Sequence, residues 1–497
     1  MNPLHLLILI PILTVIGITL SKNMKTVRWV SATGMFAQLI VTIVIMSLYQ
    51  ALRASGITDE MVFMSDYTWF PTLNIHYAIG IDGISAAMLL LTGIVVFAGI
   101  FASWELEYLQ KEFFIALILL ATGVFGFFIS IDLFTMFLYY EIAVIPMYLL
   151  IGIWGTGPKE YSAMKLTLML MGGSALLIVA LFGIYYGAGD GTISFNLLEL
   201  AKHPMKVEAQ RFFFPFAFLG FGVLGALFPF HTWSPDGHAS APTAVSMLHA
   251  GVLMKLGGYG IFRIAMYLMP QAAQEQAWIF IILTSASVIY GALGAIWQKD
   301  LKYINAYSSV SHCGLVIFGL LMMNQTAMDG AILQMISHGL MTALFFALIG
   351  MIYSRTHTRN IHEMGGLMKV IPFLAVVYMI AGFASLGLPG LSGFVAEMTI
   401  FVGAFQHGDL FHRVATIMAI SAIVVTAVYI LRVVGILLLG PIKNDHFLHL
   451  KDATWYEKIS TVTLLAAVVG VGFYPIWLYN LIFDSLAPVA HKLMTAL

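Results

Sequence analysis

Three ionisable side chains lie deep inside long apolar stretches of this sequence. Glu141, Lys255 and Glu397 each have mainly apolar neighbours on both sides. A charged group at mid-bilayer costs roughly 2.5–3.5 kcal/mol on insertion scales, so such residues face the protein interior and often mark proton pathways. A carboxyl group buried away from water keeps its proton more readily than it does in water, and a buried ammonium group releases its proton more readily. The three side chains are therefore candidate proton carriers; the competing interpretation is that they only hold helices together.

Four further side chains could relay protons between these carriers. His249, His312 and His338 lie in apolar runs, and an imidazole exchanges its proton near neutral pH. A single buried histidine is nevertheless most often a hydrogen-bonded core residue. Lys165 lies close to the polar residues at 155–160, so its ammonium could instead reach the membrane surface.

The composition indicates the environment of these side chains. Of 497 residues, 60% are hydrophobic and 9% are charged, and the mean hydropathy is +0.94. A soluble domain has about 25% charged residues. With 23 Lys and Arg against 24 Asp and Glu, a basic nucleic-acid binder is excluded. The chain is therefore predicted to be a polytopic membrane protein.

Metal binding and disulfide bonding are not expected. Cys313 is the only cysteine, which excludes an internal disulfide and a zinc site made of thiolates. His231 and His238 flank a Pro-Asp pair, but their spacing is not one that metal ligands usually have.

Fourteen apolar runs are long enough to cross a bilayer, which takes about 20 helical residues. The runs lack the alternation of membrane strands, so we predict an all-α polytopic membrane protein with about fourteen transmembrane helices. The first run lacks the basic start and cleavage site of a signal peptide and is expected to stay as the first helix. The runs are 4–20, 27–49, 83–103, 113–131, 133–154, 163–186, 212–231, 242–269, 277–297, 303–323, 330–353, 371–406, 412–438 and 459–483.

Basic residues are divided unevenly between the two sets of connecting loops. If the loop at 21–28 is cytoplasmic, its side carries fourteen Lys and Arg residues and the opposite side carries six. Cytoplasmic loops collect positive charge. Both termini are therefore expected on the non-cytoplasmic side.

Two runs are expected to be interrupted, one near Pro229 and one near Pro389, because proline and the glycines around it break helices. After the first break, Asp236 or Ser240 is expected to cap the next helix. Paired broken helices in inverted repeats are a design of transporters. The predicted organisation is an N-terminal group of helices 1–3 in residues 1–111, two inverted five-helix repeats with discontinuous helices 7 and 12 (helices 4–8 in 112–269 and 9–13 in 277–438), and helix 14 at 459–483.

The chain carries no sequence motif for an energy source of its own. It has no G-x-x-x-x-G-K-[ST] nucleotide loop and no C-x-x-C-H haem attachment site. A proton path without an energy source implies either an antiporter that uses an ion gradient or a module that partner proteins drive.

Several segments together resemble the antiporter-like subunits of respiratory complex I, the proton-pumping NADH-quinone oxidoreductase, over nearly the whole chain. Among these subunits the chain is most similar to subunit M, the mitochondrial subunit 4 type, because Glu397 stands where subunits L and N and Mrp relatives tend to carry lysine. Subunit L is also longer. The matching segments are Tyr140–Glu141 with Ile145–Gly152, Phe228–Thr243, Leu253–Gly260, Asp300–Gly314 and Gly387–Glu397.

The resemblance implies a proton path through a glutamate on the fifth helix, lysines on the seventh and eighth, and an acid on the twelfth. Glu141, Lys255 and Glu397 match three of these positions, but Leu224 stands at the seventh-helix position. In the family that lysine partners the fifth-helix glutamate. Here Glu141 is expected either to have another partner, with Lys165 and His249 as the candidates, or to be largely neutral.

The resemblance also implies where the rest of the reaction takes place. No cofactor is expected on this chain; NADH, FMN, iron–sulfur clusters and quinone would bind partner subunits. The expected partners are the other membrane and peripheral subunits of complex I, especially subunits L and N, together with the lipid of a bacterial inner membrane. No nucleic acid is expected.

Three other functions remain open at the level of sequence. The first is a cation/proton antiporter subunit of the Mrp type, against which Glu397 argues. The second is a proton-pumping subunit of a membrane hydrogenase or formate hydrogenlyase complex. The third is a passive subunit whose buried charges only join helices.

Overall fold

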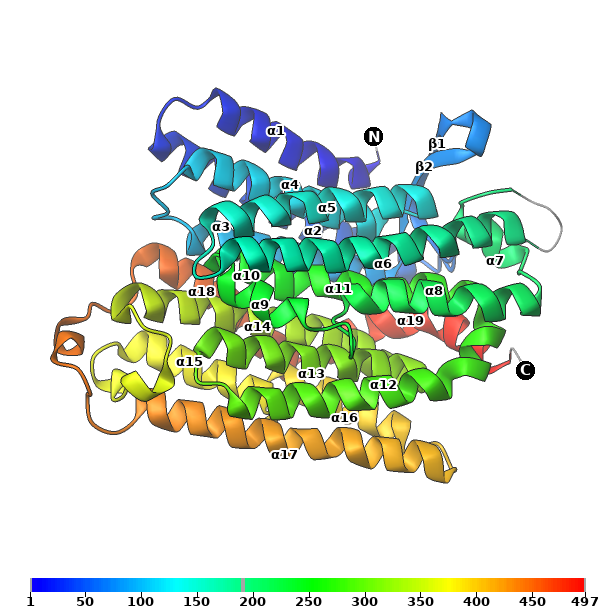
Figure 1. Ribbon diagram of the computed structural model, residues 1–497. Helices are drawn as coiled ribbons and strands as arrows, with labels where there is room; N and C mark the ends of the chain where they lie inside the picture. Colours follow the sequence, from blue (N-terminus) through cyan, green and yellow to red (C-terminus); the bar gives the residue numbers. More distant parts are fainter. Residues whose placement is uncertain (1, 189–192, 496–497) are drawn as a thin grey trace.

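The computed structural model describes residues 2–188 and 193–495 as a bundle of long helices that run roughly side by side (Figure 1). Within these residues thirteen helices are long and apolar enough to cross a membrane. Two shorter apolar helices, α15 (Pro372–Ser385) and α16 (Ser392–Ala404), together make one further crossing. The prediction of about fourteen transmembrane helices, with a discontinuous twelfth, is confirmed.

The N-terminal part contains three helices and a hairpin that projects from the bundle (Figure 1). The hairpin forms in the connection between the second and third helices, where Tyr67 pairs with Tyr77 in an antiparallel register. Aromatic and β-branched residues in both segments favour strands, a signal that the search for apolar helices passed over. The elements are α1 (Leu6–Leu20), α2 (Met24–Ala54), β1 (Val62–Phe70), β2 (Ile75–Ile81) and α3 (Gly83–Ala102).

The two five-helix repeats follow in order along the chain. The first consists of α4 (Gln110–Ile129), α5 (Leu133–Trp154), α6 (Lys159–Gly187), the short α7 (Leu197–Lys202), α8 (Val207–Leu224), α9 (Trp233–Ser240), α10 (Thr243–Leu248) and α11 (Met254–Gly260). The π-helical turns η3 (His249–Leu253) and η4 (Ile261–Met266) extend the eighth crossing on either side of α11. The second repeat consists of α12 (Pro270–Trp297), α13 (Leu301–Leu321), α14 (Gln325–Thr356), α15, α16 and α17 (Leu410–Leu438).

Equivalent aspartates mark the start of the second helix in each repeat. Asp132 caps α5 by accepting a hydrogen bond from the amide of Thr135 at 2.9 Å, and Asp300 caps α13 by accepting one from Lys302 at 2.8 Å. Each aspartate also forms a short antiparallel bridge with an asparagine further along its own repeat. The same chain path is therefore used twice.

Close packing between the first two helices of each repeat is equivalent as well. A Cβ added at Gly126 of α4 would meet the Tyr139 ring of α5 at 2.1 Å, and one added at Gly294 of α12 would meet the Tyr307 ring of α13 at 2.6 Å. The offset in sequence is the same for the glycines, the tyrosines and the capping aspartates. Five crossings separate α4 from α12, so the second copy is inverted.

The seventh crossing is discontinuous, as predicted, because α8 ends at Leu224 and α9 begins only at Trp233. The expected cap at the next helix was wrong. The residue before α10 is Pro242, and no side chain there bonds the first amides of the helix.

The last predicted span, 459–483, is two helices rather than one. Helix α18 covers Trp455–Phe473, and α19 covers Ile476–Met494 after a break at Pro475. Proline disfavours a helical conformation in the residue before it, and Tyr474 accordingly leaves the helical region. One face of α19 is buried at regular helical spacing, against α3 and α14, and its other face is exposed.

Candidate functional site

Lys255 lies at the centre of the bundle on α11, between the two π-helical turns. It is 2% exposed. Its Nζ donates a hydrogen bond to the carbonyl of Ala250 and lies 2.8 Å from Nδ1 of His338 on α14. π-Helical turns frequently occur at functional sites. Here they flank the helix that carries the lysine, and the η3 turn includes the carbonyl that it contacts.

Glycine brings the Lys255 helix close to the end of α8. A Cβ added at Gly257 would meet the amide nitrogen of Gly225 at 2.5 Å and the carbonyl oxygen of Phe221 at 2.7 Å. No side chain fits between these two backbones. The broken seventh crossing therefore packs directly against the helix that positions the lysine.

Two stacked histidines continue from Lys255 towards the second broken helix. The rings of His338 on α14 and His312 on α13 have centroids 5.1 Å apart and are inclined by 29°. His312 Nδ1 lies 3.3 Å from Oε1 of Glu397 on α16. The amide of Gln334 lies between the last two groups, 3.1 Å from the imidazole and 3.4 Å from the carboxylate.

The break between α15 and α16 positions the Glu397 carboxylate. Gly387 in this break has a positive φ of 64°, which favours glycine, and a Cβ added there would lie 3.0 Å from Oε2 of Glu397. Glu397 itself is 6% exposed. The line Lys255–His338–His312–Glu397 thus joins four helices in the bundle interior.

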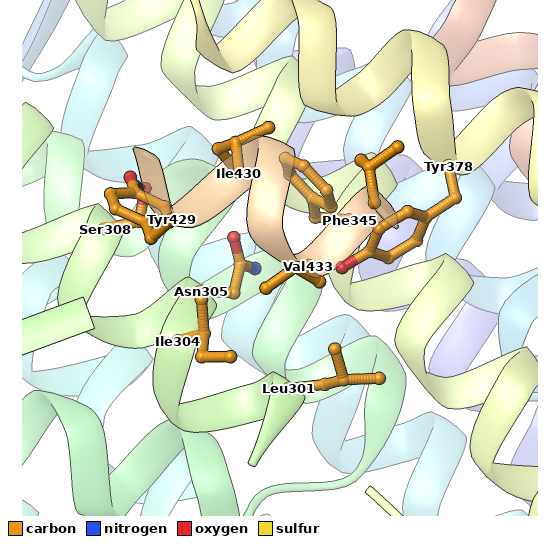
Figure 2. Close-up of a pocket in the computed structure, with 10 residues that line it drawn as sticks. Leu301, Ile304, Asn305, Ser308, Phe345, Tyr378, Tyr429, Ile430 and Val433 are labelled. Carbon is orange, nitrogen blue, oxygen red and sulfur yellow. Dashed lines mark hydrogen bonds between the residues drawn. The ribbon is translucent and has the colours of Figure 1, made fainter. Parts of the chain in front are cut away.

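A polar side branch leads from Glu397 along α17. A hollow beside α17 is lined by His312, Glu397 and Thr426. A second hollow, shown in Figure 2, is lined by Tyr429 together with Asn305 and Ser308 of α13. The Tyr429 hydroxyl donates a hydrogen bond to Ser308 at 2.7 Å. These groups extend the polar line from Glu397 towards the end of α13 that Asp300 caps.

Glu141 lies apart from this line, on α5. Its carboxylate accepts a hydrogen bond from the hydroxyl of Ser174 on α6. The carboxylate is partly exposed, and Ile145, one turn further along α5, is 63% exposed. Glu141 therefore lies near the exposed lateral face of α5.

Lys165 pairs with a carboxylate other than Glu141. Its Nζ lies 2.7 Å from Oδ2 of Asp236 on α9, and the hydroxyl of Tyr303 on α13 donates to Oδ1 of the same carboxylate at 3.1 Å. Among the described residues the partner of Glu141 is Ser174 instead. The expectation that Lys165 or His249 partners Glu141 is therefore not supported.

His249 belongs to an aromatic stack near the break in the seventh crossing. Its ring lies over Trp233 at 5.1 Å and next to His238 at 4.2 Å. All four ring nitrogens of the two histidines are buried without a hydrogen-bond partner among the described residues. Buried polar atoms of this kind bind ordered water.

Several functional candidates were missed by sequence reasoning. Gln334 lies one helical turn before His338, so an i, i+4 search from that histidine would have found it. Asp236 was considered only as a cap, and His238 only as a metal ligand. Their role in the site depends on contacts between repeats, which no local pattern reveals.

A fully buried ion pair fixes the start of α3 against the eighth crossing. Arg263, in η4, bonds the carboxylate of Asp82, which also caps α3 through the amide of Ser85 at 2.8 Å. Both charged side chains are at most 2% exposed. The pair is separate from the line that runs from Lys255 to Glu397, and it anchors the crossing that carries Lys255.

Comparison with known proteins gives consistent matches across the chain. Residues 130–425 match the family model described as NADH:quinone oxidoreductase/Mrp antiporter, TM. The NADH-quinone oxidoreductase subunit M of Rhodobacter capsulatus is 34% identical and covers 94% of this chain and 90% of its own length. An NAD(P)H-quinone oxidoreductase chain 4 of Microcystis aeruginosa is also 34% identical, over 95% of this chain and 90% of that protein.

A solved structure shares the fold of the whole chain. A chain of respiratory complex I from Thermus thermophilus superposes with a TM-score of 0.89, with 24% sequence identity over 99% of both chains.

Proposed function

The chain belongs to the NADH:quinone oxidoreductase/Mrp antiporter transmembrane family, and from this premise we propose that it is the M-type proton-translocating membrane subunit of an NADH-quinone oxidoreductase. One observation carries the assignment of its proton path. Lys255, His338, His312 and Glu397 form a continuous line of titratable groups in the bundle interior. This line ends at the discontinuous twelfth crossing.

The line can pass protons by short steps between neighbouring groups. Lys255 accepts a proton and hands it to Nδ1 of His338, which contacts it directly. The ring of His338 and the ring of His312 then lead to the Glu397 carboxylate. Because moving one charge changes the proton affinity of its neighbours, loading Lys255 promotes release at the far end.

Two groups of polar side chains outside this line support a proton route from the membrane surface to Lys255. The Lys165–Asp236–Tyr303 cluster lies next to the polar loop that precedes α6. The unpaired imidazoles of His238 and His249 lie between the broken seventh crossing and the eighth. Ordered water on these nitrogens would complete a path from that surface to Lys255.

Glu141 is suited to exchange a signal with a neighbouring subunit. It is partly exposed on the lateral face of α5, and a hydroxyl rather than a cation contacts it. A charge brought to this face by subunit L or N would therefore act on Glu141 with little competition from this chain. In this proposal the other membrane and peripheral subunits bind NADH, FMN, iron–sulfur clusters and quinone, and no redox cofactor binds this chain.

The charge distribution supports an orientation in the membrane. The loops on the side of residues 21–28 carry most of the basic residues. Both termini would then lie on the non-cytoplasmic side of a bacterial inner membrane.

Replacing Lys255 by methionine tests the proposal in the assembled complex. NADH-driven proton uptake into vesicles is expected to fall strongly, because methionine keeps the packing but cannot carry a proton. Lys22→Met, an exposed lysine at the loop, is the matched control and should pump normally. Unchanged pumping in an assembled Lys255→Met complex would support the passive interpretation, and sodium-dependent transport by the wild-type complex would support an Mrp-type antiporter.

A further inference from the structure

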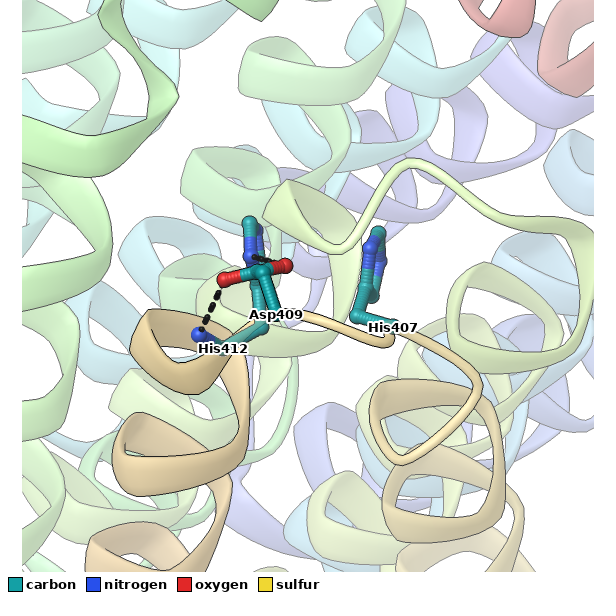
Figure 3. Close-up of side chains that lie close together, drawn as sticks. All are labelled: His407, Asp409 and His412. Atoms are coloured by element: carbon teal, nitrogen blue, oxygen red, sulfur yellow. Dashed lines mark hydrogen bonds and ion pairs between the residues drawn. The ribbon is translucent and has the colours of Figure 1, made fainter.

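A compact group of metal-binding side chains lies where α16 ends and α17 begins, away from the proton line. His407 and Asp409 are in the connection between these helices, and His412 is in the first turn of α17 (Figure 3). One potential ligand atom from each residue lies within 4.8 Å of the other two. We propose that these three side chains bind one divalent transition-metal ion of the Zn²⁺ class.

The geometry already brings two ligands into contact. His412 Nδ1 lies 2.7 Å from Oδ2 of Asp409. Zinc bonds nitrogen and carboxylate oxygen at about 2.0–2.2 Å, so ligand atoms around one ion lie roughly 3–3.5 Å apart. An ion can therefore take the place of the proton between these two atoms: Nδ1 releases that proton to solvent and Nε2 takes one up, so the ring that binds the ion is a neutral imidazole.

The third candidate ligand, His407, lies beside the other two, with its ring stacked on that of His412. The His407 and His412 rings are nearly parallel, inclined by 15°, with centroids 4.2 Å apart. An imidazole nitrogen binds a metal through a lone pair in the plane of its ring, so the two rings must tilt out of this parallel arrangement for both to bind one ion. Two imidazoles and one carboxylate with a remaining position for water are a usual ligand set for Zn²⁺.

His407 is also held in the form that binds metals. Its Nε2 lies 2.7 Å from the backbone carbonyl of Met322, so Nε2–H donates there and Nδ1 keeps its lone pair. Metal-binding histidines almost always have such a second hydrogen bond.

The hydrogen bond from His407 to the carbonyl of Met322 connects this group of side chains to the turn between α13 and α14. Met322 lies between α13 and α14, which carry His312 and His338, and α16 carries Glu397. A bound ion would therefore join the ends of the helices that form the second half of the proton line. Among the described residues no other group of three His, Cys, Asp or Glu side chains has this spacing.

The test compares zinc content in the purified whole complex. The wild-type complex and a His407→Ala/His412→Ala variant are each dialysed against micromolar Zn²⁺. Their zinc content is then measured by elemental mass spectrometry. The wild type is expected to hold one more zinc ion per complex than the double variant. His446→Ala is the matched control, because His446 stacks on His357 at 6.4 Å without forming such a three-ligand group, and it should keep the full zinc content.

Asp409→Asn separates metal binding from helix capping. Asp409 also caps α17 by accepting the amide of His412 at 3.0 Å, and asparagine caps as well as aspartate. The variant should stay assembled but bind zinc about tenfold more weakly or worse. Equal zinc content in wild type and the double variant would overturn the proposal, as would wild-type zinc affinity in Asp409→Asn; these results leave the proton path untouched.

Discussion

Replacing His338 by phenylalanine separates proton transfer from packing at the middle of the proton line. Phenylalanine keeps a ring that can stack on His312 at about the same place, but it has no nitrogen to face Lys255. In the native chain that nitrogen lies 2.8 Å from Nζ, and the two imidazole centroids are 5.1 Å apart. Without it, Lys255 keeps the Ala250 carbonyl as a partner but has no proton acceptor in reach on α14.

The size of the effect follows from the loss of one positioned transfer. Proton transfer by a well-placed side chain contributes about 10²–10⁴-fold to a rate. Transport through this subunit is therefore expected to fall by at least about 100-fold in His338→Phe. A swap that conserves volume costs less than about 1.5 kcal/mol of stability, so the complex should still assemble.

The assay measures NADH oxidation and proton uptake together in sealed vesicles. His338→Phe should lower the protons moved per NADH, or slow oxidation and uptake together. His338→Gln restores a polar atom but not a titratable one and should therefore pump as poorly as His338→Phe, and His446→Phe at an exposed position should behave as wild type. A His338→Phe complex that matches wild type in both rates would refute the proton line.

Three other substitutions test separate parts of the structure. Glu397→Gln replaces the carboxylate by an amide of similar size. The complex should assemble normally but lose most proton uptake in the same vesicle assay, because an amide does not titrate. Normal uptake would remove Glu397 from the path. Asp82→Asn keeps the cap of α3 but leaves the buried Arg263 uncompensated, so it should cost about 3–5 kcal/mol, measured as a lower Tm, and Arg263→Met in the same chain should recover part of that loss. Gly257→Ala forces a Cβ into the backbone of α8 and should cost about 1–3 kcal/mol and reduce pumping, whereas Gly172→Ala, with nothing within 4 Å, should change neither Tm nor pumping.

The sequence predicted the number of crossings and both broken helices because these features are local. Apolar runs of sufficient length and the proline-glycine segments around Pro229 and Pro389 are visible without any knowledge of contacts. The last boundary was wrong for a related reason. The apolar run that defined this span continues past Pro475, because hydropathy alone does not register a helix break. The helix ends at that proline, and the amphipathic residues beyond it form a separate helix.

The inverted repeat also left a signal that was not used. Asp132 and Asp300, and Tyr139 and Tyr307, are related by one constant offset in sequence, as are the glycines that the two rings cover. A search for equal offsets among capping and small residues would have aligned the two halves directly. The buried apolar positions hide the similarity between the two repeats, because most large apolar residues can replace one another in a core at membrane depth.

The candidate site was only partly predictable, because its parts come from both repeats. Lys255, His338, His312 and Glu397 were all identified as unusual in an apolar setting, but their order in space was not. The partner of Glu141 was wrongly expected among cations, since charge complementarity suggests a cation and gives no weight to the hydroxyl of Ser174.

The loss of the seventh-helix lysine has a structural consequence for coupling within the chain. Leu224 is fully buried at the end of α8, so no cation there acts on Glu141. Lys165 on the neighbouring helix α6 is already paired with Asp236 at 2.7 Å. Glu141 therefore has a hydroxyl and no cation as its partner among the described residues. The proposal that a charge of a neighbouring subunit acts on Glu141 rests on this partner and on the partial exposure of the residue on α5.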